Sequence, residues 1–154
     1  MAAVYKINDD FYDESFALVA VHTTLQDYSL AYELNQGLNL KLKRARKDFD
    51  LAENKSFPYF EWEDVKRDIY WVLISNQSCQ QQLLANNDLF QNESTFIKPR
   101  LIPEYKDVDY LLKIESENQI EIDKFIKKIA SLPQVMASYE VKTDKLKSKN
   151  NLIF

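Results

Sequence analysis

The stretch Val108–Val141, VDYLLKIESENQIEIDKFIKKIASLPQVMASYEV, decides the fold because it holds three regular elements in a row. Residues 108–115 place Val, Tyr, Leu and Ile at every second position, which predicts a strand. From Ile122, apolar side chains recur at i, i+3, i+4 and i+7, which predicts a helix with one apolar face. Val135–Val141 alternates again and predicts another strand. Together they form one strand-helix-strand unit.

A second unit of this kind is predicted nearer the N-terminus. Phe16–Val21, FALVAV, is apolar at every position, which is typical of a central strand covered on both sides, or on one side by a helix. A helix from Thr24 to Gln36 follows, with Thr24 as its cap and Gly37 as its left-handed stop. Its packing face is expected to consist of Leu25, Tyr28, Ala31 and Tyr32.

A hairpin and an insertion lie between the two units. The alternation of leucine with polar residues over 38–43 first predicts a half-buried strand. Residues 57–63 and 69–74 then predict a hairpin around the turn at 64–67. Residues 75–98 are polar and rich in amide side chains, so we expect an insertion or a long surface loop there.

These elements predict an α+β fold with a mixed or antiparallel sheet of about five to seven strands and two main helices on one face. The arrangement is ferredoxin-like, βαβ…βαβ, with an added hairpin and an insertion. We expect residues 1–141 to form one domain, with 1–7 as a short edge strand before an acidic loop at 9–14. Residues 142–154 are expected to form a basic tail with the apolar tip Leu152-Ile153-Phe154.

The composition excludes several classes of site. The single glycine, Gly37, is too few for a phosphate-binding loop, which needs several glycines around the anion. The single Cys79 and the single His22 rule out an internal disulfide, a cysteine zinc site and a two-histidine metal site. We therefore predict no cofactor and no metal.

Location and charge are predicted from the same composition. No apolar run approaches the about 18 residues of a membrane-spanning helix, and the acidic N-terminus lacks the features of a signal peptide. A cytoplasmic protein is the resulting expectation. The net charge of −4 disfavours nonspecific binding of nucleic acid or anionic lipid by the whole surface, but it leaves a local basic patch open.

One nine-residue segment carries a family resemblance. It reads Ile102-Pro103-Glu104-Tyr105-Lys106-Asp107-Val108-Asp109-Tyr110. This looks like the signature after which the bacterial IPExxxVDY family is named. The stretches 16–34, 38–46 and 61–64 look similar to that family too, so the resemblance covers nearly the whole chain. It implies no activity, cofactor or ligand, because none is established for that family.

In physical terms the signature is a loop that leads into a strand. Pro103 stiffens the loop, and we expect Val108 and Tyr110 to share the inward face of the strand. The carboxylates Glu104, Asp107 and Asp109 lie within six residues. They suggest either a cation site, an acid/base pair, or exposed carboxylates with structural partners. We favour structural partners, because a hard-cation site needs around six converging oxygens and usually a glycine turn.

Two side chains are weak candidates for catalysis. His22 closes the predicted central strand just before a helix, where ligands often bind in open sheets. It could act as a general base with a carboxylate such as Asp109, but a hydrogen-bonded histidine at a strand end is the favoured interpretation. Cys79 has no cationic neighbour that would lower its thiol pKa, so a nucleophilic role is disfavoured.

A dense cationic run follows the first helix. Its members are Lys41, Lys43, Arg44, Arg46 and Lys47. These cations could contact phosphates, with stacking surfaces from the aromatic side chains Tyr59, Trp62, Tyr70 and Trp71. The competing interpretation is that Glu61 and Glu63 neutralise Lys41 and Lys43 across the sheet.

The function most consistent with these observations is a non-enzymatic protein–protein interaction module, or a subunit or adaptor of a larger complex, with an unknown protein partner. The tail at 142–154 is either a docking peptide or a frayed terminus. The first alternative is an RNA-associated accessory factor that uses the basic strand. The second is a small-molecule-binding domain or an enzyme at His22. A homodimer is open, because an exposed edge strand could pair between two copies.

Overall fold

A computed structural model gives the conformation of most of the chain. It describes residues 16–52, 55–78, 82–83, 96–97 and 99–152. Several expectations therefore lie outside the described residues. They concern the edge strand at 1–7, the acidic loop at 9–14, Cys79, most of the insertion at 75–98, and the tip residues Ile153 and Phe154.

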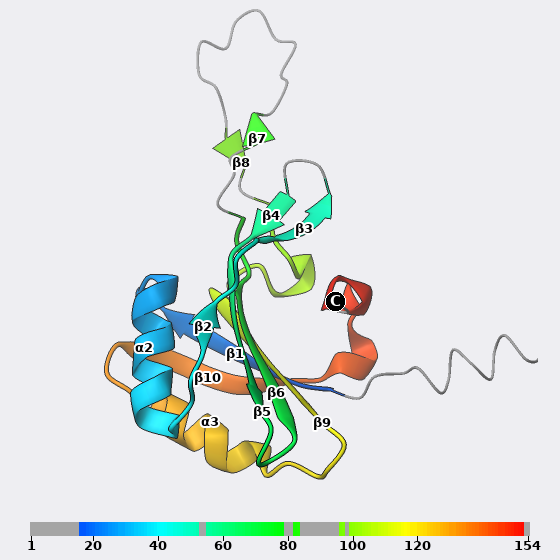
Figure 1. The fold of residues 1–154 in the computed structure, drawn as a ribbon. Coiled ribbons are helices and arrows are strands. Elements are labelled where there is room, and N and C mark those ends of the chain that lie inside the picture. Colours follow the sequence, from blue (N-terminus) through cyan, green and yellow to red (C-terminus); the bar gives the residue numbers. More distant parts are fainter. Residues whose placement is uncertain (1–15, 53–54, 79–81, 84–95, 98, 153–154) are drawn as a thin grey trace, which may run out of the picture.

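The structure is α+β, as expected, with one six-stranded antiparallel sheet and two helices on one of its faces (Figure 1). The sheet has the order β10-β1-β9-β6-β5-β2. Its strands are β1 Phe16–Thr23, β2 Lys43–Arg44, β5 Tyr59–Asp64, β6 Ile69–Ser75, β9 Tyr110–Ser116 and β10 Val135–Val141. The helices are α2 Asp27–Leu38 and α3 Ile122–Ala130. Among the described residues, neither helix is long and apolar enough to cross a membrane.

Smaller elements complete the described structure. Two short hairpins pair β3 Phe49–Ala52 with β4 Lys55–Phe57 and β7 Gln82–Leu83 with β8 Phe96–Ile97. Three 3-10 turns are η1 Pro103–Tyr105, η2 Thr143–Lys145 and η3 Lys149–Leu152.

The predicted strand-helix-strand unit β9-α3-β10 is present and straddles β1. Strands β9 and β10 both pair antiparallel with β1, so they run parallel to each other on its two sides. This is the split βαβ arrangement of ferredoxin-like folds. The predicted hairpin is also confirmed as β5 and β6, and it extends the sheet beyond β9 toward β2.

Strand β1 is buried on both faces, which is the first of the two arrangements that its sequence predicts. Val19 and Val21 belong to the hydrophobic cluster under the helices, whereas Leu18 and Ala20 belong to the cluster on the opposite face. Each of the four is fully buried. Because successive side chains of a strand point to opposite faces, an uninterrupted apolar run requires a cover on both sides of the sheet.

Helix α2 begins later than expected, and of its predicted packing residues Leu25 and Ala31 contact the core whereas the two tyrosines do not. Its N-cap is Gln26, which makes no side-chain cap hydrogen bond, so the prediction of a Thr24 cap is wrong. Tyr28 and Tyr32 are 61% and 62% exposed, whereas the buried side chains are Leu30, Ala31, Leu34 and Leu38. The leucine row is the more apolar of the two faces, and tyrosine can keep its hydroxyl in water, so burial of the leucines is favoured.

The prediction that Gly37 is the left-handed stop of α2 is wrong. The left-handed residue is Asn39, with φ 56°, whereas Gly37 lies inside the last turn. A Cβ at Gly37 would lie 2.6 Å from Leu132 Cδ2, after the end of α3. The glycine therefore permits the close approach of α2 to the chain that follows α3.

The expected strand over residues 38–43 is reduced to the two residues of β2. The predicted alternation of burial is present: Leu38, Leu40 and Leu42 are buried in the cluster under the helices, and the residues between them are exposed. The side chain of Asn35 accepts a hydrogen bond from Leu42 N–H at 2.9 Å and donates one to Leu42 O at 3.2 Å. These bonds tie the segment to α2 and occupy the backbone groups that a longer strand would need.

The sheet face opposite the helices is covered by the C-terminal residues and by the loop at 99–108 (Figure 1). Leu146 and Leu152 are 8% and 0% exposed and belong to the hydrophobic cluster on this face. The expectation of an apolar tip available for docking is therefore wrong for Leu152. The physical reason is that a sheet with both helices on one face needs apolar side chains from elsewhere to cover the other.

We expect Leu152→Ala to lower the free energy of unfolding by about 2–4 kcal/mol, because it removes a fully buried aliphatic side chain and leaves a cavity. Urea denaturation of the full chain measures this loss. The matched control is Val65→Ala at the hairpin turn, where the side chain is 82% exposed, and it should change stability by less than about 0.5 kcal/mol. Equal, small effects of both substitutions would show that the C-terminal residues are a loose tail.

Candidate functional site

The signature segment 102–110 is held in place by the side chain of Asn76, directly after β6. Asn76 is fully buried. Its Nδ2 donates hydrogen bonds to the carbonyl oxygens of Tyr105 at 2.9 Å and Val108 at 3.0 Å. Its Oδ1 accepts one from the Ile102 N–H at 2.8 Å. One buried amide thus satisfies three backbone groups of the loop and fixes its path before β9.

Glu104 of the signature binds the C-terminal residues. Its two carboxylate oxygens accept hydrogen bonds from the Ser148 hydroxyl at 2.5 Å and the Ser148 N–H at 3.1 Å. The bond from the hydroxyl is the main reason that the pKa of Glu104 lies below its usual value. Nearby, Asn151 Nδ2 donates to the Leu101 carbonyl at 2.9 Å. The loop and the C-terminal residues therefore hold each other on the sheet.

Asp109 and Tyr110 connect the signature to the turn between β1 and α2. Asp109 Oδ2 accepts a hydrogen bond from the Thr23 N–H at 2.9 Å, and the Tyr110 hydroxyl donates to the Leu25 carbonyl at 2.8 Å. Burial, assisted by nearby carboxylates, raises the pKa of Tyr110 to about 12. Val108 and Tyr110 lie in the hydrophobic clusters of opposite faces, so the expectation of a shared face is wrong. Strand β9 begins only at Tyr110, and Val108 belongs to the loop.

The three signature carboxylates do not converge on one point. Glu104 is committed to Ser148 and Asp109 to Thr23, while Asp107 is exposed. Within the described ranges, no group of three or more His, Cys, Asp or Glu side chains is placed to hold a metal ion. The hydrogen bonds of the signature carboxylates instead hold the loop at 102–110 against the turn after β1 and against the C-terminal residues.

His22 lies beside a tyrosine. Its Nε2 is hydrogen-bonded to the Tyr139 hydroxyl at 3.0 Å, and the ring centroids are 5.5 Å apart. Burial, with smaller contributions from Tyr105 and Asp107, raises the pKa of Tyr139. Asp109, the carboxylate suggested for a general-base pair, is bonded to backbone instead. In the part of the chain that the structure describes, His22 has no carboxylate hydrogen-bond partner to orient its ring.

Lys113 is a buried charge that the sequence reasoning missed. It is 0% exposed, at the centre of β9. Its Nζ donates a hydrogen bond to the Leu152 carbonyl at 2.5 Å, lies 2.6 Å from Glu115 Oε1, and sits 4.9 Å from the centroid of the Phe16 ring. A buried ammonium needs such partners to offset its desolvation. The one available signal was a lysine inside the otherwise apolar run LLKI.

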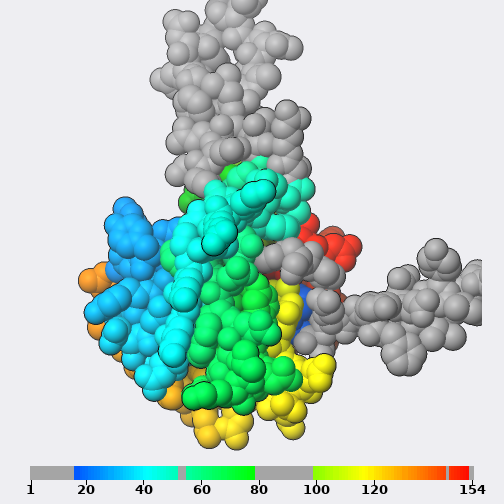
Figure 2. Space-filling model, in the orientation of Figure 1, coloured from blue at the N-terminus to red at the C-terminus, as the bar shows by residue number. Residues whose placement is uncertain are grey.

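The basic run lies on the surface at and around β2 (Figure 2). All of its cations are exposed: Lys41, Lys43, Arg44, Arg46 and Lys47. Lys43 faces Glu61 in the β2–β5 ladder, as the competing interpretation requires. Glu61, however, accepts a hydrogen bond from the Tyr70 hydroxyl, and Arg44 forms its ion pair with Asp48. Among the described residues, no ion pair joins Lys43 to Glu61 within 4 Å.

An open hollow of about 740 Å³ borders the basic run. Its lining includes the aromatic side chains of Tyr59, Trp62 and Tyr70, all partly buried. Burial and the hydrogen bond to Glu61 raise the pKa of Tyr70, so its hydroxyl stays neutral. Trp71 was expected beside them, but it is fully buried on the helix face and stacks edge-on against Phe125 of α3, at 5.1 Å. Trp62 is the cross-strand partner of Trp71 and packs on the same helix-side cluster, whereas Tyr59 and Tyr70 pack on the opposite face.

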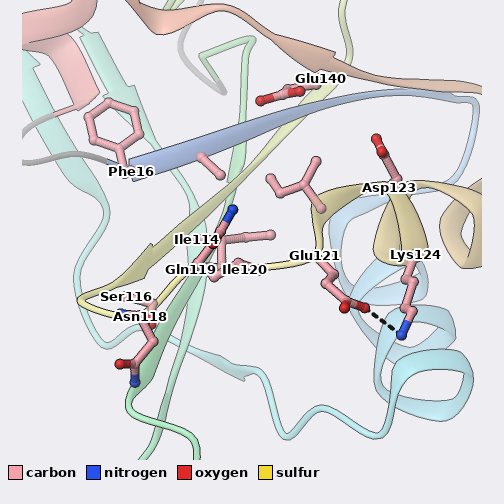
Figure 3. A pocket seen from close by; sticks show the side chains of 12 residues that line it. Phe16, Ile114, Ser116, Asn118, Gln119, Ile120, Glu121, Asp123, Lys124 and Glu140 are labelled. Atoms are coloured by element: carbon pink, nitrogen blue, oxygen red, sulfur yellow. Dashed lines mark hydrogen bonds and ion pairs between the residues drawn. The ribbon is translucent and has the colours of Figure 1, made fainter.

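A second hollow, of about 900 Å³, lies where α3 begins beside the ends of β1, β9 and β10 (Figure 3). Glu121 and Asp123 lie at the helix start, and Glu140 projects from β10 on the far side. Glu121 is paired with Lys124. Carboxylates already occupy the positive end of the helix, so this hollow offers no anion-binding site.

The outer edge of β10 is the longest unpaired strand edge in the described structure. Its neighbour on one side is β1, and in the described part of the chain nothing pairs with its other side. Met136 and Tyr139 are 67% and 38% exposed along it. The opposite sheet edge, β2, has two residues, Lys43 and Arg44. The sequence predicted β10 as a strand but contained no signal that it lies at an edge.

We expect Asn76→Ala to lower the free energy of unfolding by about 3 kcal/mol or more, because three buried backbone groups each lose their partner. Urea denaturation gives the loss, and amide hydrogen exchange at Ile102 should become faster. Asn118→Ala, at an exposed asparagine, is the matched control and should be near neutral. An unchanged exchange rate at Ile102 would show that Asn76 does not hold the signature loop in place.

Comparison with known proteins gives no relative: no family model, no curated protein and no solved structure matches the chain. The resemblance to the IPExxxVDY family therefore stays a prediction from the signature residues.

Proposed function

We propose that the protein is a binding module without catalytic activity, which attaches another protein chain along the outer edge of β10. The observation that carries this proposal is the unpaired outer side of a seven-residue strand. Every second residue of an edge strand turns its N–H and C=O groups outward, and those groups are a template for a further strand. Addition of a strand to such an edge is a common mode of protein recognition.

The two sheet edges differ in a way that favours β10. Folded proteins protect their edges with short strands, proline, or charged side chains, lysine above all. Strand β2 has this protection, since it consists of Lys43 and Arg44 alone. Strand β10, VMASYEV, has no proline and no lysine, and its exposed residues include Met136, Ala137 and Tyr139. Its pairing with β1 shifts between His22 and Thr23, so Met136 is bulged out of the ladder and the regular part of the edge is residues 137–141. That regular part is suited to pairing.

The C-terminal tip and the amide-rich insertion support this proposal less than the strand edge does. Leu152 of the predicted docking tip packs in the hydrophobic cluster of the sheet, so the tip loses one of its three apolar residues. Most of the amide-rich insertion at 75–98 lies outside the described residues. The proposal of a protein partner therefore rests on the strand edge.

We expect a tagged full-length chain, isolated from its native cell in mild salt after nuclease treatment, to retain another protein chain or an untagged copy of itself. Ala137→Lys should weaken retention at least about tenfold, because a lysine on the outer strand blocks strand addition. Tyr28→Lys adds the same charge at an exposed site of α2 and should have no effect. The retained chain is then purified and its affinity for each variant is measured. Equal affinity for both variants would refute a role of β10.

A second candidate is binding of single-stranded RNA at the basic run. It is favoured by the exposure of all five cations and by the aromatic side chains in the adjoining hollow. Cations supply phosphate contacts, and exposed ring faces can stack on bases.

For this candidate we expect weak binding of a single-stranded RNA oligonucleotide, measured by fluorescence anisotropy, that falls steeply as salt increases. The double substitution Lys43→Gln with Lys47→Gln should weaken RNA binding and make its salt dependence shallower. With fewer phosphate contacts, binding releases fewer counterions from the RNA. Lys127→Gln with Lys128→Gln on α3 makes the same change in net charge and serves as the control. Binding that is independent of salt, or equally weakened by both pairs, would exclude the basic run.

A further inference from the structure

We propose that a hollow between the β5–β6 turn and helix α3 binds a small monoanion with an apolar body, of the class of aryl or branched-chain carboxylates. The hollow has a volume of about 280 Å³ and is bordered by Arg67 and Ile69, by the chain between β9 and α3, and by one side of α3. These three segments lie together at the lower end of the molecule in Figure 1. The β10 edge does not take part, so the inference goes beyond the proposed function.

The floor of the hollow is apolar. Ile69 is 8% exposed, Ile120 and Phe125 are half-buried, and all three belong to or pack against the hydrophobic cluster under the helices. The Phe125 ring packs edge-on against Trp71, with the ring centroids 5.1 Å apart, and this contact restrains its orientation. The volume lies near the lower limit of about 300 Å³ for sites that bind small organic ligands. It therefore suits a body of one ring or one branched chain.

The rim of the hollow is cationic. Of the described residues that line it, three are cations, Arg67, Lys124 and Lys128, and one is a carboxylate, Glu121. Glu121 is paired with Lys124, and Asp64 lies 3.6 Å from Arg67 Nε. Among the described residues, no ion pair within 4 Å involves Lys128. One unpaired ammonium group matches one negative charge on a ligand.

Helix α3 places this ammonium group beside the apolar floor. Lys128 follows Phe125 by three residues and Lys124 by four, so the three side chains lie on one side of the helix. The amide side chains of Asn118 and Gln119 line the same hollow and can donate hydrogen bonds to a carboxylate. A ligand whose apolar body rests on Phe125 therefore has its charged group close to Lys128.

The hollow of about 900 Å³ described above shares residues 118–121 with this one but has a different charge. Its lining adds Asp123 and Glu140 to Glu121 (Figure 3), and it includes neither Arg67 nor Lys128. The larger hollow therefore disfavours an anion, whereas the smaller one attracts it.

The probe for this site is phenylacetate, which has one ring and one carboxylate. Its titration into the full chain, followed by amide NMR shifts, should give saturable shifts at Ile69, Ile120 and Phe125, with a Kd on the order of 1 mM for a ligand of this size. The indole N–H signal of Trp71 should shift as well, because its ring contacts Phe125. Phenethyl alcohol has the ring without the charge, and acetate has the charge without the ring. Each should bind at least about fivefold more weakly than phenylacetate.

Variants of α3 test the contribution of the charge. Lys128→Gln removes the unpaired ammonium group and should weaken phenylacetate binding by about three- to tenfold, whereas Lys128→Arg should retain it. The matched control is Lys127→Gln, which makes the same change in net charge at an exposed neighbour outside the lining, and it should leave the affinity unchanged. Thermal unfolding of each variant checks that the fold is retained.

Four outcomes would overturn the inference. Shifts that do not saturate, or that cluster away from the hollow, overturn the site itself. Equal affinity for phenylacetate and phenethyl alcohol overturns the preference for an anion. Equal affinity for phenylacetate and acetate overturns the contribution of the apolar floor, and equal losses in Lys128→Gln and Lys127→Gln overturn the role of Lys128.

Discussion

The central strands β1 and β9 are buried on both faces, and that constraint shapes the rest of the molecule. The two helices supply apolar side chains to one face alone. The other face is covered by the β3–β4 hairpin, the loop at 99–108 and the C-terminal residues with their 3-10 turns. The backbone groups of the loop and the C-terminal residues need partners once they leave water. Asn76 supplies three of those partners to the loop at 102–108, and Lys113 binds the carbonyl of Leu152 at the C-terminal end.

The same need to cover the sheet explains the hydrogen bonds of the polar residues in the signature segment. In the sequence alone, the signature residues Glu104, Asp109 and Tyr110 suggest a reactive site. In the structure, the two carboxylates accept hydrogen bonds and the Tyr110 hydroxyl donates one, and each of these bonds positions a neighbouring segment. His22 is placed beside Tyr139, at the margin of the same face. Side chains committed to holding a cover in place are poorly suited to turn over a substrate, because each would have to release its structural partner. The perimeter of the sheet, by contrast, carries the unpaired backbone groups of β10 in the described structure.

At that perimeter the two edges are unequal. One is two residues long and cationic, and the other is seven residues long with neither lysine nor proline. Strand β10 is bulged at Met136, and its remaining residues leave a longer row of outward backbone groups than β2 does. The basic run beside β2 is exposed, and Arg44 within it forms an ion pair with Asp48.

The sequence by itself determined the element order, because each main strand and α3 has a periodicity that local backbone geometry requires. It also indicated that β1 is a central strand, and it excluded glycine-rich loops and two-histidine metal sites. Only the tertiary structure decided that α2 buries its leucines and not its tyrosines, that Leu152 is core, that Lys113 is paired in the interior, and that β10 is an edge. Periodicity reports which residues share a face, but the partner of that face is set by contacts between segments distant in the chain, and these leave no local pattern.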